Sequence, residues 1–170
     1  KVADTFEGYD FPIIRYAEVL LNYAEAMYEL GTTGKALDDA LNISLNLVRL
    51  RVNPDMPKLT TSFVSENNLN MREEIRRERT IELYNEGFRI DDLKRWNTAI
   101  VEMPKPILGV KWTGTDFATS WAGASNMAKD SDGCLILENS RRWGSKNDLY
   151  PLPVDQCQLN PNLGQNPGWQ

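Results

Sequence analysis

The sequence predicts an all-α domain made of helical hairpins, a long irregular insert and an extended C-terminal strap. Apolar residues recur at three- and four-residue steps through roughly the first hundred residues. This spacing is lost between residues 104 and 148, where Gly, Ser, Thr, Asp and Asn become dense. Residues 149–170 then contain four prolines, which leave the backbone little freedom. We therefore expect a helical part at 1–103, an insert at 104–148 and a strap at 149–170, all in one domain.

The first two predicted helices form a hairpin. Residues 10–30 carry one apolar face, with Asp10 as the candidate N-cap and Gly31 as the residue that ends the helix. A second helix is expected over residues 35–51. The pattern is close to one tetratricopeptide unit, and a generic αα-hairpin fits it equally well. One such unit cannot bury both of its faces, so we expect neighbouring helices.

A helix–turn–helix corner is predicted at residues 66–101. Glutamates recur every fourth residue in the helix expected at 66–86, with Ser65 as its cap, so they form one ridge of like charge. Gly87 ends this helix, and another is expected at 89–101. We expect ion pairs between arginines and the ridge to hold the corner. The residues concerned are Glu74, Glu78, Glu82 and Glu86, with Arg49, Arg51, Arg79, Arg89 and Arg95.

Two pairs within this corner have hydrogen-bonding offsets: Arg79 with Glu82, and Asp92 with Arg95. Trp96 follows on the same helix and is expected in the core. Loss of Arg89 is expected to cost a few kcal/mol if its partner carboxylate is buried, since a lone buried charge costs about 3–5 kcal/mol.

The acidic residues of the corner also suit a different role. They contain pairs that fit a general acid and base, or a magnesium site. Arginine neighbours lower a carboxyl pKa, however, whereas a catalytic acid needs a raised one. Histidine, the commonest base and metal ligand, is absent from the 170 residues. We therefore expect no catalytic residue, no metal site and no cofactor. The carboxylates concerned are Glu78, Glu82, Glu86, Asp91 and Asp92.

Composition limits the partners and the location. The net charge is −5 and the pI about 4.9, so no basic stripe is available for nucleic acid or an anionic membrane surface. No apolar run approaches the roughly 20 residues that span a bilayer. Cys134 and Cys157 lack metal or redox spacing, so free thiols are expected, with a disulfide as the alternative. Because the chain starts at Lys1 and enters a helix within about ten residues, we expect a piece of a longer polypeptide.

The insert carries the candidate binding residues, Trp112, Trp121 and Trp143. Indole rings on loops offer flat apolar faces on which the C–H faces of sugar rings stack. The alternative is that these rings pack the insert onto the helices. In the strap, Leu152, Leu163 and Trp169 are the expected anchors against the helices.

Four segments of the sequence are distinctive when taken together. They are I-I-R-Y-A-E-V-L-L-N-Y-A-E-A at 13–26, L-N-L-V-R-L-R-V at 45–52, R-R-E-R-T-I-E-L-Y-N-E-G-F-R-I-D-D-L-K-R-W at 76–96, and L-Y-P-L-P with N-P-N-L-G-Q-N-P-G-W within 149–169. Together these segments resemble the SusD/RagB family of outer-membrane nutrient-binding lipoproteins. They occur in the family's order and correspond to its C-terminal part. The stretch from about 104 to 146 is unmatched.

The resemblance implies a mainly helical protein at the cell surface, held on the outer membrane by a lipid anchor that this chain lacks. It implies non-catalytic binding of oligosaccharides, or peptides in some members, and delivery to a SusC-like TonB-dependent transporter. The charged corner is an architectural mark in that family. Two other functions stay open: a tetratricopeptide-type adaptor that binds a peptide or protein partner, and a carbohydrate-active enzyme that uses Glu82 and Asp92.

Overall fold

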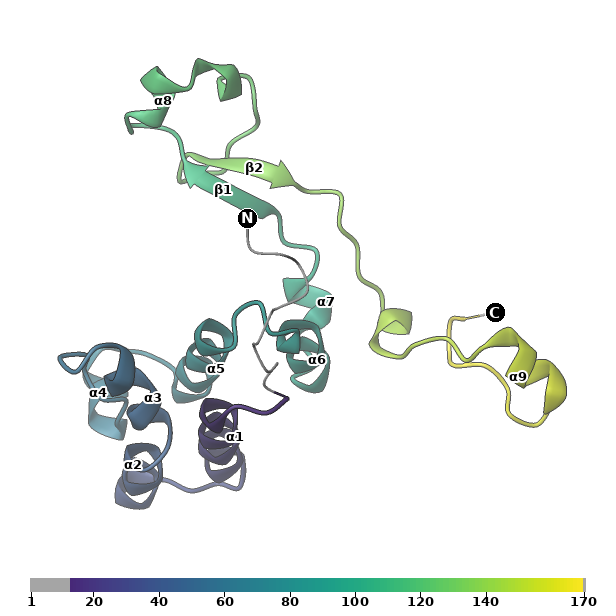
Figure 1. Cartoon of the computed structure of the whole chain (residues 1–170), viewed down its shortest axis with the longest axis horizontal. Helices are drawn as coiled ribbons and strands as arrows, with labels where there is room; N and C mark the ends of the chain where they lie inside the picture. The colour runs from purple at the N-terminus through teal and green to yellow at the C-terminus, as the bar shows by residue number, and fades with distance from the viewer. Residues whose placement is uncertain (1–12, 170) are drawn as a thin grey trace, which may run out of the picture. The chain divides into compact units, whose positions relative to one another are not determined.

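The computed structural model describes residues 13–169 and divides the chain into two compact units, residues 1–89 and 90–170. The described residues are mainly helical, with one small two-stranded sheet, which confirms the all-α prediction (Figure 1). The division falls in the first turn of helix α6 (Phe88–Arg95).

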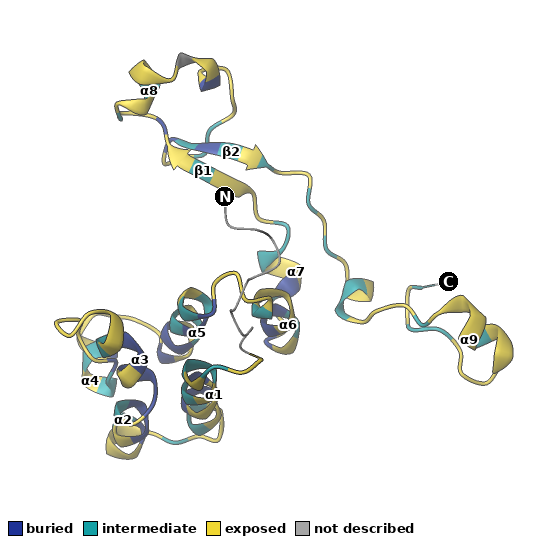
Figure 2. Ribbon diagram, viewed as in Figure 1, coloured by how far each residue is buried: buried dark blue, intermediate teal, exposed yellow. Residues whose placement is uncertain are grey.

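The first unit is built from short helices around one apolar core. They are α1 (Tyr16–Glu29), α2 (Gly34–Asn42), α3 (Leu45–Val52), α4 (Thr61–Glu66) and α5 (Met71–Glu82). α1 packs against α2, α3 and α5. Buried residues, dark blue on the ribbon of Figure 2, lie where these helices face one another. The fully buried core residues include Leu21, Leu41, Leu45, Leu59 and Ile75.

The end of α1 matches the sequence prediction. Gly31 has φ +84°, and the amides of Gly31 and Thr32 donate to the carbonyls of Tyr28 and Met27. This is the Schellman arrangement, which satisfies the carbonyls at a helix end. The predicted cap Asp10 lies outside the described residues.

The helix predicted at 35–51 is two helices. α2 ends at Asn42 and α3 starts at Leu45, with Ser44 between them at φ −136°, ψ −98°. The hydroxyl of Ser44 donates to the carbonyl of Ala40, a bond by which serine competes with the regular helix. Because the apolar spacing runs through the break, the sequence pattern did not reveal it.

The helix predicted at 66–86 is shorter in the structure, since α5 begins only at Met71, and the separate helix α4 precedes it and ends at Glu66. Asn70, rather than Ser65, caps α5 by accepting from the amide of Glu73, and Thr60 caps α4 by accepting from the amide of Phe63. α5 ends at Glu82, so Glu86 lies beyond the helix. The chain turns through Asn85 and Gly87, both with positive φ, so the turn predicted at Gly87 is present, but Gly87 does not end α5.

A buried amide holds the connection before α4. Asn46 is fully buried on α3, its Nδ2 donates to the carbonyl of Leu59 at 3.0 Å, and its Oδ1 accepts from the Leu59 amide at 2.7 Å. These two hydrogen bonds satisfy the backbone N–H and C=O of Leu59. The Leu59 side chain can therefore enter the core without leaving buried backbone groups unpaired.

Arginines meet the glutamate ridge, as predicted, and the strongest contacts come from Arg15, which precedes α1. Its guanidinium donates to Glu82 Oε1 at 2.9 Å, to the Glu82 carbonyl at 2.9 Å and to both carboxylate oxygens of Glu86 at 2.7 and 2.8 Å. These bonds, led by those to Glu86, raise the pKa of Arg15 above its ordinary value. Arg51 also pairs with Glu82 at 2.9 Å. Both cations lie at the C-terminal end of α5, where the helix dipole favours positive charge.

Arg49 and Glu78 form the buried member of this network. The Arg49 side chain is 3% exposed and that of Glu78 13%, with Nη1 and Oε2 3.3 Å apart. Among the described residues, Nε and Nη1 of Arg49 find no hydrogen-bond acceptor. Burial raises the pKa of Glu78 above its ordinary value of 4.5, and the attraction of Arg49 opposes that rise. The attraction between the two charges therefore stabilises the pair, while the low exposure of the site disfavours the ionised form of each group.

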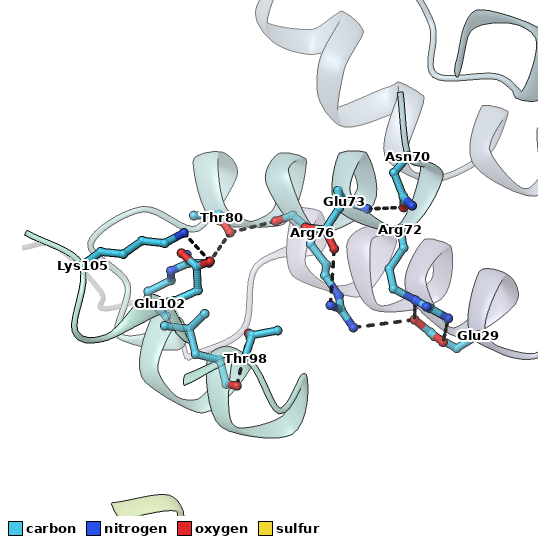
Figure 3. Close-up of polar contacts among 11 residues, drawn as sticks. Glu29, Asn70, Arg72, Glu73, Arg76, Thr80, Thr98, Glu102 and Lys105 are labelled. Carbon is cyan, nitrogen blue, oxygen red and sulfur yellow. Dashed lines mark hydrogen bonds and ion pairs between the residues drawn. The ribbon is translucent and has the colours of Figure 1, made fainter. Parts of the chain in front are cut away.

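A further set of pairs lies at the other end of α5. Arg72 donates to both carboxylate oxygens of Glu29 at 2.8 and 2.9 Å (Figure 3). Its guanidinium also lies 5.3 Å from the ring centroid of Tyr28. These groups are largely exposed, so we assign them a small part of the stability.

Arg89 does not have the buried carboxylate partner that was considered for it. Its side chain is exposed, and Nη1 donates to the hydroxyl of Thr80 at 2.9 Å. Asp92 and Arg95 do pair, at 2.8 Å, as predicted. Arg79 is buried and donates to Asn22 at 2.7 Å, which ties α5 to α1.

The second unit begins with α6 and continues through α7 (Ala99–Glu102), so the helix predicted at 89–101 is interrupted. The break is at Asn97, which has φ +55°. Leu93, Ala99 and Trp96 form a small core, which confirms that Trp96 is a core residue.

The rest of the second unit is more regular than predicted. The insert contains β1 (Ile107–Lys111), α8 (Phe117–Ser120), a 3₁₀ turn η1 (Ala122–Ala124), β2 (Cys134–Glu138) and a 3₁₀ turn η2 (Ser145–Asp148). The strap contains α9 (Val154–Leu159). Leu163 is exposed and is not an anchor, whereas the Trp169 ring nitrogen donates to the carbonyls of Lys146 and Leu149 at 2.7 and 3.0 Å.

The first prediction concerns the buried pair. We expect Arg49→Met to lower the free energy of unfolding by about 3 kcal/mol, because Glu78 then keeps a partly buried charge without its cation. The double variant Arg49→Met/Glu78→Gln should recover most of that loss, since neither charge remains. Chemical denaturation of the complete protein measures both effects.

Arg89→Ala is the matched control, because this arginine is exposed. Its unfolding free energy should stay within about 0.5 kcal/mol of the unchanged protein. A double variant no more stable than Arg49→Met would show that the charges of the pair do not set its energy.

Candidate functional site

The insert is a β-hairpin with a folded head. β1 and β2 pair antiparallel, with Ile107 opposite Glu138 and Lys111 opposite Cys134. The two strands therefore bring the ends of the insert together and carry the residues between them as one projecting segment. Several apolar side chains of the strands, including Ile107, Leu108, Val110 and Leu137, are exposed.

The head has a small core of its own. Trp112 is 5% exposed and packs with Ala124 and Leu135, with Ala118 against them. Gly133 closes the head at φ +81°, where a Cβ would come within 2.5 Å of the Thr113 side chain. Only glycine fits this turn without a shift of its neighbours. Trp112 is therefore a structural residue of the head, and its ring faces are covered.

Trp121 differs sharply from Trp112. Its side chain is 58% exposed, and its ring lies 6.3 Å from that of Trp112 at an interplanar angle of 53°. The buried indole supports the exposed one, so Trp121 presents an apolar surface on a structured base. A ring in this position is available for stacking on a ligand.

Trp143 lies in a different part of the second unit. It packs against the core of Leu93, Trp96 and Ala99, and its Nε1 donates to Asp148 Oδ1 at 3.0 Å. The half-buried ring has the packing role that was the alternative for all three tryptophans. It also lines a pocket, so it combines a structural contact with an accessible surface.

This pocket has a volume of about 260 Å³ and is walled by α6, η2 and the strap. Lys94, Trp143, Asn147, Tyr150 and Trp169 are among the residues that line it. The volume is below the 300–1,000 Å³ typical of drug-sized ligands, so it suits one sugar ring. The structure thus separates the predicted tryptophans into a surface platform at Trp121 and a pocket at Trp143, with Trp112 buried.

Hydrogen bonds within the strap fix the walls of the pocket. Gln165 accepts from the amide of Leu152 at 2.7 Å and donates to its carbonyl at 2.8 Å. Asn166 donates to the carbonyl of Tyr150 at 2.6 Å. Together with the bonds of Trp169, these contacts hold residues 146–152 against 165–169.

The sequence analysis did not select Lys94, Tyr150 or Trp169 as binding residues. Tyr150 and Trp169 belong to the L-Y-P-L-P and N-P-G-W segments, which were assigned only an anchoring role. Lys94 lies in the charged corner, where cations were expected to meet carboxylates. Its partners are instead aromatic rings, and sequence spacing gave no sign of that.

Other kinds of site have no support in the described part of the chain. Across residues 13–169, no three acidic or cysteine side chains come together in a group that could hold a metal ion. Cys134 and Cys157 are free, so the disulfide alternative is wrong. No helix in the same range is both long and apolar enough to cross a membrane.

The comparisons place the chain in a family. The sequence profile described as the SusD family matches residues 2–169, and the chain belongs to this family. No curated protein matches the sequence.

Two solved structures are similar to this chain. One is a SusD-like carbohydrate-binding protein from Bacteroides fragilis, with 31% identity and a TM-score of 0.67 over 90% of this chain and 28% of that protein. The other is the selenomethionine form of the protein BT4246, with 28% identity and a TM-score of 0.68 over 95% of this chain and 25% of that protein. The chain thus spans about a quarter of the length of either structure.

A prediction follows for two carboxyl groups with opposite environments. The amide and hydroxyl of Ser140 bond Glu138 and lower its pKa, whereas burial raises that of Glu78. In an NMR titration of the carboxyl carbons, we expect Glu78 to titrate above 4.5 and Glu138 below it.

The two carboxyl groups also change the free energy of unfolding with pH in opposite directions. The folded protein holds the Glu78 proton more tightly than the unfolded chain does, so this contribution is complete below pH 4.5 and is lost as the pH rises through the raised pKa. Glu78→Gln should remove this pH dependence. A Glu78 midpoint at or below that of Glu138 would contradict the assigned burial.

Proposed function

We propose that the complete protein binds glycans at the cell surface without catalysis. The main support is the 31% identity, over 90% of this chain, to a SusD-like carbohydrate-binding protein. Membership of the SusD family also supports the expectation that the chain is not an enzyme. Binding would combine stacking of sugar rings on exposed indoles with hydrogen bonds from neighbouring polar groups.

Within this chain, Trp121 and Trp143 are the ligand contacts that we propose. The exposed ring of Trp121 offers a platform, and Trp143 lines a pocket suited to one sugar ring. Trp112 would act by supporting Trp121. The two positions need not contact the same sugar unit.

We expect Trp121→Ala to weaken glycan binding about tenfold with an unchanged melting temperature, because an exposed ring contributes contact area to the ligand and little to the core. Trp112→Ala should instead destabilise the head by about 3–5 kcal/mol, because it removes a buried aromatic ring. Calorimetric titration of the complete protein with an oligosaccharide panel, alongside thermal unfolding, separates the two effects.

In that screen, a complete protein that binds no oligosaccharide would refute the proposed function. Binding that is equally strong in Trp121→Ala would leave glycan binding in place and remove Trp121 from the site.

The further proposal is that bound glycan passes to a SusC-like TonB-dependent transporter in the outer membrane, where a lipid anchor holds the complete protein. This step follows from the family and concerns parts of the protein beyond this chain. We expect the complete protein to co-purify with an outer-membrane transporter of that class after mild detergent extraction. Recovery in the soluble fraction with no such transporter would contradict it.

A groove in the first unit supports the alternative of a peptide-binding adaptor. It lies between α1 and α3, has a volume of about 550 Å³ and is lined mainly by apolar residues such as Ala17, Leu20 and Leu47. Binding of peptides, in place of sugars, in the same calorimetric screen would favour the adaptor.

A further inference from the structure

Lys94 has an unusual environment for a lysine of a charged helix. Its Nζ lies 3.9 Å from the ring centroid of Tyr150 and 5.8 Å from that of Trp143. Within residues 13–169 its ammonium group forms no ion pair. The side chain is only partly exposed, so its charge is held at the pocket by ring faces rather than by a carboxylate.

Aromatic rings stabilise an ammonium group incompletely. A cation–π contact contributes about 0.5–2 kcal/mol, and it uses the faces of the rings without accepting the three N–H bonds that an ammonium donates. Lys94 therefore retains donor capacity where it lines the pocket. Asp148 Oδ1 accepts a hydrogen bond from Trp143 Nε1 at 3.0 Å and orients that ring.

The other walls of the pocket suit a sugar. Trp143, Tyr150 and Trp169 offer apolar ring surfaces, and Asn147 adds an amide that both donates and accepts. Because the strap bonds described above hold Tyr150 and Trp169, little order has to be gained on binding.

From this arrangement we propose that the pocket binds a sugar residue that carries a carboxylate, such as a hexuronic acid, with Lys94 as the partner of that carboxylate. This inference rests on the proposed glycan-binding function and names the class of glycan. The sugar ring stacks on the aromatic walls, and its hydroxyls bond Asn147. The charge-assisted bond to Lys94 distinguishes an acidic sugar from a neutral one of the same size.

The test is a calorimetric comparison on the complete protein. The acidic ligands are oligogalacturonate, hyaluronan and heparosan fragments and sialyllactose, and the neutral ligands are galacto-oligosaccharides and lactose of matched length. We expect at least one acidic glycan to bind at least tenfold more tightly than its neutral counterpart. That preference should shrink as salt is added, because the added contact is between charges. Sulfated glycan fragments are tested in the same way. If they bind as tightly as the carboxylated sugars, the pocket recognises anions in general, and the proposed specificity for a carboxylate is wrong.

Substitutions locate the effect. Lys94→Met keeps the length of the side chain and removes its charge, so it should bring the ratio of acidic to neutral affinity close to one. Lys94→Arg should retain the preference. Lys146→Met is the matched control, because Lys146 also lies over an aromatic ring, 4.9 Å from the centroid of Trp169, and is not among the pocket residues.

The outcomes separate the two proposals. Binding of neutral and acidic glycans with equal affinity would overturn this inference and leave the glycan-binding function intact, whereas no glycan binding at all would overturn both. A preference for acidic glycans that persists in Lys94→Met, or that is lost equally in Lys146→Met, would also overturn the role of Lys94. If Lys94→Met does not fold, the comparison of matched ligands on the unchanged protein and on Lys94→Arg still decides the question.

Discussion

Arg49 and Glu78 lie 3.3 Å apart where water is nearly excluded. The need to keep these two buried charges together constrains the packing of the helical unit. A buried guanidinium needs a carboxylate nearby, so α3 and α5 are held to one relative position. Arg15 and Arg51 add contacts at the end of α5, and Arg15 reaches it from the start of α1. The apolar core supplies the burial energy, and the buried charges add a requirement on where α3 and α5 lie.

Charged and aromatic groups are combined differently at the glutamate ridge of the first unit and at the pocket of the second. In the first unit, carboxylates meet arginines, which argues for a structural role of the acidic ridge and against general acid–base chemistry there. In the second unit, the indole and phenol rings are partly accessible and meet the cations Lys94 and Lys146. A lysine paired with rings keeps its charge available to a ligand, whereas one paired with a carboxylate does not. On this basis the binding site that we propose lies at the pocket beside α6 and not at the ridge.

The sequence predicted the helical class, the ridge with its arginines and the turns at Gly31 and Gly87, because each depends on spacing along one helix or on one glycine. It did not predict the break at Ser44 or the early end of α5 at Glu82, since apolar spacing continues through both. The hairpin was missed because its five-residue strands lie among turn residues and alternate weakly. Trp112 is buried and Trp121 is exposed because of the way the head folds. The residues around the two tryptophans in the sequence are too similar in character to predict this difference.

The hairpin gives the chain an exchangeable module. Its two strands leave and re-enter the second unit beside each other, with Ile107 opposite Glu138, and the head between them packs on its own core. Changes in the length of such a segment cost little, because the free energy of closing a loop rises only slowly with its length. Related proteins could thus acquire new surface chemistry by replacing the head while the buried charges of the helices stay as they are. The paired strands β1 and β2 would then be the place where evolution, or protein design, exchanges the binding surface while the helices keep their fold.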